Sequence, residues 1–497
     1  MIRQRVSILA PLLGLLAVAC TDSEDARALR VDMLAEPTDF SNPIAALPSP
    51  ADALLLEATA QGLVRLDGEG QIEPALAQRW IVLDEGQTYV FRLNDVTWDD
   101  GTAVTAGQVV QQLRTASRVN RNNRIAALLS DIETVNAVTP MVVEINLTRP
   151  RLDFLQLLAT PDLAIFVEGA GLGPYEIADG YEPDSEMILL APRREPPEIV
   201  DDEIVELPPI APSETIELRF RTAATAVARF DAELADIVLG GSWATLVLAE
   251  AINPNSNQLQ IDPVDGLYGL AIVEQTGFLE TPQNREVLSL AIDRGQLAGY
   301  FGADLAEARL TIVPADVDGL LDPVGPPWVN STIALRRAFA RQAVASWTAD
   351  NGDIEPLRIA LPDGPGSRVV FAVLRTNWAA VGIPVERVAW TDDADLRLID
   401  RVAATESATW YLEQFRCNRG LPCSDDYADL LEQIDEVESD RVRAIRIGEA
   451  ATELQRLTPY IPLLRPIRWS LVSPRISGFT PNRFGSHPLD TLGAPPS

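Results

Sequence analysis

The chain has 497 residues, of which 72 are acidic and 40 basic, and its formal net charge is −32. A field of this sign repels phosphate backbones, so nucleic acid is excluded as a partner class. Every basic residue is an arginine, and a chain without lysine has no Walker A loop, Schiff-base lysine or Ser–Lys dyad. The only histidine, His487, has no G-x-S-x-G turn before it, which argues against a Ser-His-Asp hydrolase.

Residues 1–19 predict a secretory signal. Arg3 and Arg5 precede an apolar run from Val6 to Ala19, which is too short to span a bilayer and ends in the letters AVAC at Cys20. We predict a lipobox whose Cys20 is diacylated, since two acyl chains suffice for stable anchoring. The alternative is an ordinary signal with a chance cysteine at its end. Thr21 follows Cys20 in place of Asp, so the sequence carries no signal for retention in the inner membrane. The anchor can therefore be in the inner or the outer membrane.

The other two cysteines, Cys417 and Cys423, are predicted to form a disulfide, because an exported chain then has no leftover thiol. Closing so small a loop contributes about 2 kcal/mol in the chain-entropy model. Metal binding is the competing interpretation. One histidine and no second cysteine pair cannot complete four ligands of the usual kind, so we expect no metal and no cofactor.

The elements of the first third follow one another in a definite order. An apolar helical run, Leu54–Leu63, precedes a predicted hairpin of Trp80–Leu83 and Thr88–Leu93, joined by a tight acidic turn. Thr105 and Gln108 then form a T-x-x-Q capping box, which marks a helix start. Apolar residues at helical spacing follow, which predicts that this helix has one apolar face.

This order resembles the opening of the family 5 extracellular solute-binding proteins, the peptide receptors of bacterial ABC importers. Gln61 to Val64 match the "EGLV" stretch of the family, and Pro74 to Trp80 match its "P-LA-W" turn. Thr88 to Leu93 match its "tytFrLR" strand, and Trp98 to Val110 match its "W-DG-pvTA-DVv" helix start. Gln108 departs from the usual Asp. The resemblance implies an α/β fold of the periplasmic-binding-protein type, with two lobes around a ligand cleft and the extra N-terminal subdomain of the peptide-binding class.

In the middle of the chain, Val138–Leu147 is predicted to be one strand and Phe154–Leu158 a short helix. The glycine-rich residues 169–173 precede Pro174 and a strand rather than a helix, so they do not form a dinucleotide loop. They resemble the "GTGPY" turn of the family instead. The acidic, proline-rich stretch Arg193 to Pro212 is predicted to be a solvated loop.

The second half alternates strands and helices. A βαβ unit is predicted from a strand at Leu357–Ala360, a helix at Ser367–Val381 and a second strand at Pro384–Ala389. Ser367 is the predicted helix cap. Asn284 to Gly302 resembles a helix of the family. The other predicted elements are strands at Ile216–Arg221, Asp395–Ile399 and Tyr460–Leu464 and helices at Ala223–Leu234, Ile333–Trp347 and Arg441–Leu457.

The resemblance also suggests ligand-binding residues. Many family members carry a tryptophan followed by an acidic loop at the cleft, and Trp410, with Tyr411 beside it, and the acidic Asp425 and Asp426 occupy this region. A tryptophan can stack on a flat group, and a carboxylate can pair with a peptide's ammonium terminus. The alternative is a core tryptophan and a solvated aspartate pair that caps the helix from Tyr427.

We therefore expect a monomeric, lipid-anchored periplasmic receptor that hands a peptide or similar small solute to an ABC permease of the inner membrane, without catalysis. The alternatives are a carboxylate-based periplasmic hydrolase and a two-lobed lipoprotein that has lost transport. The predicted division is a signal peptide (1–19), a tether (20–30), lobe I (31–51, 165–260 and 465–497), a subdomain inserted in lobe I (52–164) and lobe II (261–464).

Overall fold

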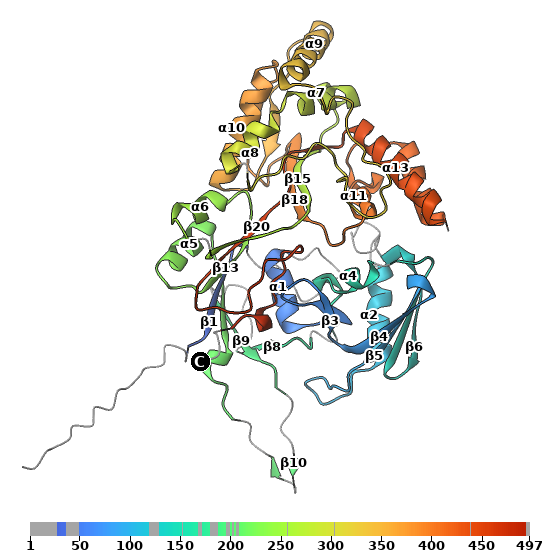
Figure 1. Ribbon diagram of the computed structural model, residues 1–497, viewed down its shortest axis with the longest axis vertical. Helices are drawn as coiled ribbons and strands as arrows, with labels where there is room; N and C mark the ends of the chain where they lie inside the picture. Colours follow the sequence, from blue (N-terminus) through green and yellow to red (C-terminus); the bar gives the residue numbers. More distant parts are fainter. Residues whose placement is uncertain are drawn as a thin grey trace, which may run out of the picture.

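The computed structural model describes residues 27–35, 49–118, 129–151, 153–166, 171–178, 187–194, 199–200, 203–204, 208–255, 257–302, 304–437 and 439–493. The predicted signal peptide and Cys20 lie outside these residues. Among the described helices, none combines the length and apolar character needed to cross a bilayer. Three larger sheets organise the chain, and each is the centre of one part of the molecule (Figure 1).

The seven-stranded part is built on a mixed sheet in the order β14-β20-β13-β1-β12-β9-β8. Its strands are β1 (Leu29–Met33), β8 (Tyr175–Ile177), β9 (Met187–Pro192), β12 (Ile216–Phe220), β13 (Ile237–Gly241), β14 (Leu259–Asp262) and β20 (Arg468–Val472). The apolar β1 is central and lies parallel to β12 and β13. The helices of this part are α1 (Pro50–Thr59), α5 (Ala223–Asp231) and α6 (Leu246–Ala251). A capping box of Ser49 and Asp52 begins α1, which packs its leucines on the sheet.

The four-stranded part is an antiparallel sheet in the order β4-β5-β7-β6, with α2 packed on it. Its elements are β4 (Ala77–Leu83), β5 (Thr88–Leu93), α2 (Ala106–Arg118), β6 (Ile132–Thr139), β7 (Val142–Leu147) and α4 (Phe154–Leu158), next to the small pair β2 (Val64–Leu66) and β3 (Ile72–Pro74). The β4–β5 hairpin confirms the prediction. The prediction of one strand over Val138–Leu147 is wrong, because Pro140 and Met141 form the turn between β6 and β7.

The predicted helix cap at Thr105 is also present in part. The side chain of Gln108 accepts a hydrogen bond from Thr105 N at 2.9 Å and another from Trp98 Nε1 at 3.3 Å. A glutamine oxygen can thus do what the carboxylate of the usual family Asp would do at this position. The substitution preserves the contact between the Trp98 turn and the start of α2.

The five-stranded part has the strand order β17-β16-β18-β15-β19. Its strands are β15 (Gly266–Ile272), β16 (Leu357–Ala360), β17 (Val385–Val388), β18 (Leu396–Val402) and β19 (Tyr460–Pro462), and its helices are α7 (Pro282–Ala291), α8 (Arg294–Phe301), α9 (Ile333–Asn351), α10 (Pro365–Ala379), α11 (Ala408–Glu413), α12 (Asp425–Glu436) and α13 (Asp440–Leu457). β16 and β17 are parallel and joined through α10, which confirms the βαβ unit.

Three local predictions differ from the structure. Asn284 to Gly302 is two helices, because Asp293 is extended and caps α8 by accepting from Gln296 N at 3.0 Å. The cap of α10 is Gly364 rather than Ser367, which is buried in the first turn. The described residues of the predicted loop from 193 to 212 include two short strands, β10 (Ile199–Val200) and β11 (Glu203–Ile204).

The chain passes between the seven-stranded and five-stranded parts along two adjacent segments. Residues 263–265 lead from β14 to β15, and residues 463–467 lead from β19 back to β20. Arg465 ties the two segments together by donating to the carbonyls of Val264 at 2.7 Å and Pro263 at 2.8 Å. Two adjacent crossing segments are the arrangement expected of a hinge.

Candidate ligand cleft

A cavity of about 1700 Å³ lies between the seven-stranded and five-stranded parts. On one side it is lined by α1, residues 159–162, the ends of β1 and β13, and the start of β20. On the other side it is lined by residues 362–365, Arg368, Trp390, β18 and residues 419–421. The volume exceeds that of a typical small-molecule pocket, about 300–1,000 Å³, and is large enough for a peptide-sized solute.

Glu57 of α1 projects into the wall on the seven-stranded side. Its carboxylate accepts a hydrogen bond from Ser486 Oγ at 3.0 Å. Burial raises the pKa of Glu57 from its ordinary value of 4.5 to about 7, and the nearby Asp490 adds to this, whereas Ser486 and Arg65 act in the opposite direction. This group therefore changes charge near neutral pH.

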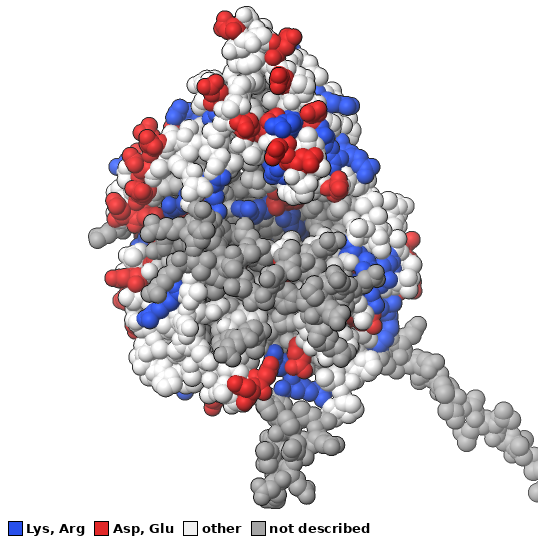
Figure 2. All heavy atoms as spheres, turned by 180° about the vertical axis from the view of Figure 1, so that it is seen from behind, with Lys and Arg blue, Asp and Glu red and all other residues white. Residues whose placement is uncertain are grey.

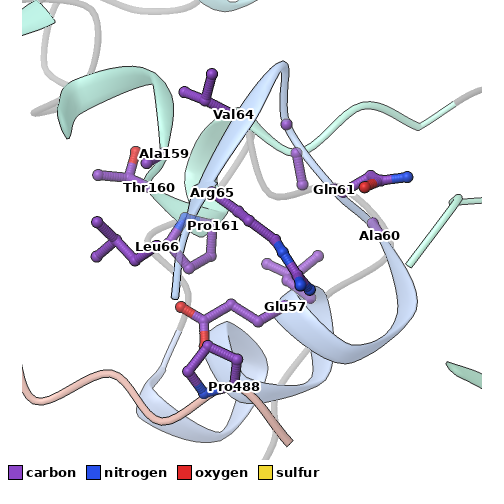
Figure 3. A pocket seen from close by; sticks show the side chains of 13 residues that line it. Glu57, Ala60, Gln61, Val64, Arg65, Leu66, Ala159, Thr160, Pro161 and Pro488 are labelled. Atoms are coloured by element: carbon purple, nitrogen blue, oxygen red, sulfur yellow. The ribbon is translucent and has the colours of Figure 1, made fainter. Parts of the chain in front are cut away.

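A side pocket of about 30 Å³ opens beside Glu57 (Figure 3). It shares part of its wall with the large cavity, since Glu57, Leu66 and residues 159–161 line both. Arg65 lines it and pairs with Glu73 and Asp490, each at 2.7 Å. The pocket has room for a water molecule or two but not for a solute.

The wall on the five-stranded side is basic and aromatic. The guanidinium of Arg397 lies 5.2 Å from the ring centroid of Trp390, and Trp390 is 45% exposed. Arg397 donates to the carbonyl oxygens of Trp390 and of Asp392, the latter at 2.8 Å. Arg401, two residues further along β18, donates to Gln414 Oε1. In the view from behind, basic side chains gather in a band at mid-height, beneath acidic side chains of the upper part (Figure 2).

The only histidine of the sequence is in the cavity wall. His487 Nε2 lies 3.0 Å from Asp262 Oδ2, and both residues are buried. The other oxygen of Asp262 accepts from Asn482 N at 2.9 Å, while the imidazole stacks on Phe479 with centroids 4.2 Å apart. Such a partnered histidine ties the C-terminal segment to the end of β14. Nothing in the sequence pattern links these two residues, which are 225 positions apart.

The residues predicted to bind the ligand are elsewhere. Trp410 and Tyr411 are each 1% exposed and pack edge to face in the core of the five-stranded part, where Tyr411 donates to Asp265 Oδ1 at 3.1 Å. Asp425 and Asp426 are exposed in the first turn of α12. None of the four lines the cavity. This geometry fits the alternative of a core tryptophan and a solvated aspartate pair, and as ligand-binding residues the four remain predictions.

Cys417 and Cys423 form the predicted disulfide, with their Cα atoms 5.3 Å apart. The loop that they close carries Arg419, Gly420 and Leu421, which line the cavity. The disulfide therefore fixes a short segment of the cleft wall. In the described residues, no group of three or more His, Cys, Asp or Glu side chains is placed to hold a metal ion.

One sequence signal could have led to the wall on the five-stranded side. In open α/β sheets, ligands bind beyond the carboxyl ends of parallel strands. Residues 362–368 follow β16 and Trp390 follows β17, so the predicted βαβ unit already placed them at this edge. Trp390 was the aromatic residue that this rule would have selected.

The fold and the cleft define a two-lobed binding protein, and comparison with known proteins gives its family. The model of the bacterial extracellular solute-binding proteins, family 5, matches residues 71–401, and the chain belongs to this family.

Among curated relatives, the glutathione-binding protein GsiB of Escherichia coli is 26% identical over 288 residues, and the alignment spans 54% of each chain. The chain thus covers about half of that relative's length. It is also 35% identical over 121 residues to the probable deoxycholate-binding periplasmic protein YgiS of Escherichia coli, covering 21% of this chain and 23% of YgiS. Among solved structures, OppA of Burkholderia pseudomallei has a TM-score of 0.80 at 16% identity, covering 95% of this chain and 99% of OppA.

Proposed function

We propose that the chain is the solute-binding component of an ABC importer, capturing a peptide or similar small solute and delivering it to a membrane permease. Family membership and the 1700 Å³ cavity between two sheet-based parts support this proposal. The cavity is the observation that carries it, because an open space of this size between lobes suits reversible capture of a guest.

We further propose that the seven-stranded part is lobe I, the five-stranded part lobe II and the four-stranded part an inserted subdomain, with the boundaries predicted from the sequence. The two adjacent crossing segments support a hinge about which the lobes close on the ligand. Closure would bury the solute and let backbone groups and bridging water contact it.

The proposal includes a periplasmic location, an anchor through acylated Cys20 and a monomeric state. The predicted signal sequence and the similarity to YgiS, a periplasmic protein, support the location. The relatives' names give a range of solutes, glutathione and deoxycholate, so the family resemblance alone leaves the ligand class of this chain open.

Native mass spectrometry of the protein purified from its own cells tests the proposal. We expect a bound compound of peptide-like mass that is released on denaturation and remains unchanged after prolonged incubation with fresh protein. X-ray scattering should show a more compact particle with this compound than after its removal by partial unfolding and refolding. Chemical conversion of the compound would show an enzyme, and a protein that binds nothing would lack the proposed function.

A further inference from the structure

The cleft has a charge balance unlike that of the chain. Over the whole sequence, acidic residues outnumber arginines 72 to 40. Among the described residues, by contrast, six arginines and five acidic residues line the cavity. The arginines are Arg221, Arg368, Arg397, Arg401, Arg419 and Arg468. The cavity wall is therefore close to electrically balanced, with one more arginine than acidic residues, in an otherwise strongly acidic protein.

Most of the acidic groups in the wall already have partners within the protein. The pairs are Asp400–Arg468 at 2.8 Å, Asp262–His487 at 3.0 Å and Asp363–Arg387 at 3.3 Å. Glu57 accepts from Ser486, and its raised pKa reduces its negative charge near neutral pH. Asp400, Asp262 and Glu57 are thus poorly placed to receive a cationic ligand, whereas the side chain of Asp363 is fully exposed.

Arg397 presents an uncancelled charge. It donates to the neutral carbonyls of Trp390 and Asp392, and it forms no ion pair with any carboxylate of the described residues. Stacking on Trp390 holds the planar group in place. A fixed guanidinium loses less freedom when it binds an oxyanion, so this contact is pre-organised.

Arg368 provides a second charge. It is exposed in the first turn of α10, lines the cavity and has no ion-pair partner in the described part of the chain. Residues 362–368 and Trp390 follow the parallel strands β16 and β17 at the same sheet edge, and Arg397 lies on β18, which is parallel to β16. The topology therefore brings both arginines to the edge at which α/β sheets bind ligands.

We infer that Arg397, stacked on Trp390, and Arg368 bind an oxyanion, a carboxylate or phosphate group, of the transported solute. The guanidinium fork matches either group with paired hydrogen bonds. This inference rests on the proposed function and adds the ligand class to it. It gives the cleft a preference for anionic over cationic solutes.

The test uses the immobilised full-length protein and the fraction below 1 kDa of an extract of the cells that produce it. The extract is used untreated, after methyl esterification in acidic methanol, and after treatment with alkaline phosphatase. Compounds enriched by the wild type, R397Q, R368Q and R375Q are identified by mass spectrometry. Arg375 lies on the same helix α10, is exposed and does not line the cavity, so R375Q is the matched control.

We expect an enriched compound with a carboxylate or phosphate, at least tenfold weaker capture by R397Q and R368Q, and unchanged capture by R375Q. Loss after esterification identifies a carboxylate, and loss after phosphatase a phosphate. Because Arg368 is exposed, R368Q tests the inference even if R397Q folds poorly.

An enriched compound that carries neither a carboxylate nor a phosphate, or equal capture by all four proteins, would overturn the inference and leave the proposed function standing. If the wild type enriches nothing from any extract, the proposed function fails and the inference fails with it.

Discussion

Two of the regions in which the five-stranded part contacts the rest of the molecule differ in kind. At the crossing segments, Asp265 accepts from Arg309 Nη2 at 2.6 Å, and Trp243 Nε1 donates to the carbonyl of Arg465 at 2.8 Å. These contacts are next to covalent connections. In the proposed closure about these segments such contacts can be kept, because residues near a pivot move little relative to one another.

The second region is an ion network with no covalent connection nearby. Arg149, which follows β7, is 7% exposed and pairs with Asp131 at 2.8 Å in its own part. It also donates to the side chain of Asp435, at the end of α12, at 3.2 Å and to its carbonyl at 3.0 Å. Arg416, beside α11, pairs with Asp435 as well, at 3.3 Å. The network thus bridges the four-stranded and five-stranded parts on the side where α11 and α4 face each other (Figure 1).

The two regions differ in how much free energy it costs to break their contacts. A buried charge whose partner is removed costs far more than a hydrogen bond near the surface, because it must be rehydrated or left unpaired. Separating the four-stranded from the five-stranded part would break every contact between Arg149 and Asp435. We therefore expect the network, rather than the crossing segments, to dominate the energetics of lobe contact.

The largest expected effect is that of Arg149→Met. The apolar side chain keeps much of the volume but leaves Asp131 with Arg151 alone, at 3.1 Å, and removes the bridge to Asp435. We expect a loss of about 3–5 kcal/mol in the free energy of unfolding, measured by urea denaturation. A loss below about 1 kcal/mol would show that the network contributes little and would remove the distinction drawn above.

Glu57, a half-buried acid without a paired arginine, gives a second comparison with the ion network. Because the pKa of Glu57 is raised to about 7, the neutral acid is favoured in the folded state, and stability is lost as the pH rises from about 4.5 through 7. Glu57→Gln keeps an acceptor for Ser486 and removes this loss. We expect the variant to equal the wild type at pH 4 and to exceed it by up to about 3 kcal/mol at pH 8.

Denaturation midpoints at several pH values measure this difference. A constant offset between Glu57→Gln and the wild type at all pH values would mean that ionisation of Glu57 does not carry the effect.

At the crossing segments, Asp265→Asn should have a smaller effect than Arg149→Met. Asparagine preserves the shape and can still accept from Tyr411, but it removes the charge next to Arg309. Since Asp265 is only partly buried, we expect a loss of about 1.5–3 kcal/mol in urea denaturation. A loss equal to or larger than that of Arg149→Met would show that the contacts at the crossing segments contribute more to stability than the Arg149 network does.

Local pattern was sufficient for much of the fold. Two strand-like runs around a tight acidic turn predicted the β4–β5 hairpin, and the order of elements predicted the βαβ unit of β16, α10 and β17, although the helix cap is Gly364 rather than Ser367. Alternation failed at Val138–Leu147, where apolar residues continue on both sides of a turn at Pro140 and Met141.

The site was much harder to predict, because its residues meet only through tertiary structure. His487 and Asp262 come from distant parts of the chain, and Arg149 meets Asp435 across 286 positions. Trp410 illustrates the same limit, since an aromatic residue suits a core as well as a cleft and packing alone places it in the core.

The smallest expected effect completes the comparison. Arg446 of α13 pairs with Glu449 at 2.6 Å, one turn away, with side chains 37% and 46% exposed. Solvent screens such a pair and side-chain freedom opposes it, so Arg446→Met should change the unfolding free energy by less than about 0.5 kcal/mol. This is the same substitution as at Arg149, in the same protein and assay. A comparable loss at both positions would mean that removal of any arginine from this acidic chain destabilises it, and that burial and bridging add nothing.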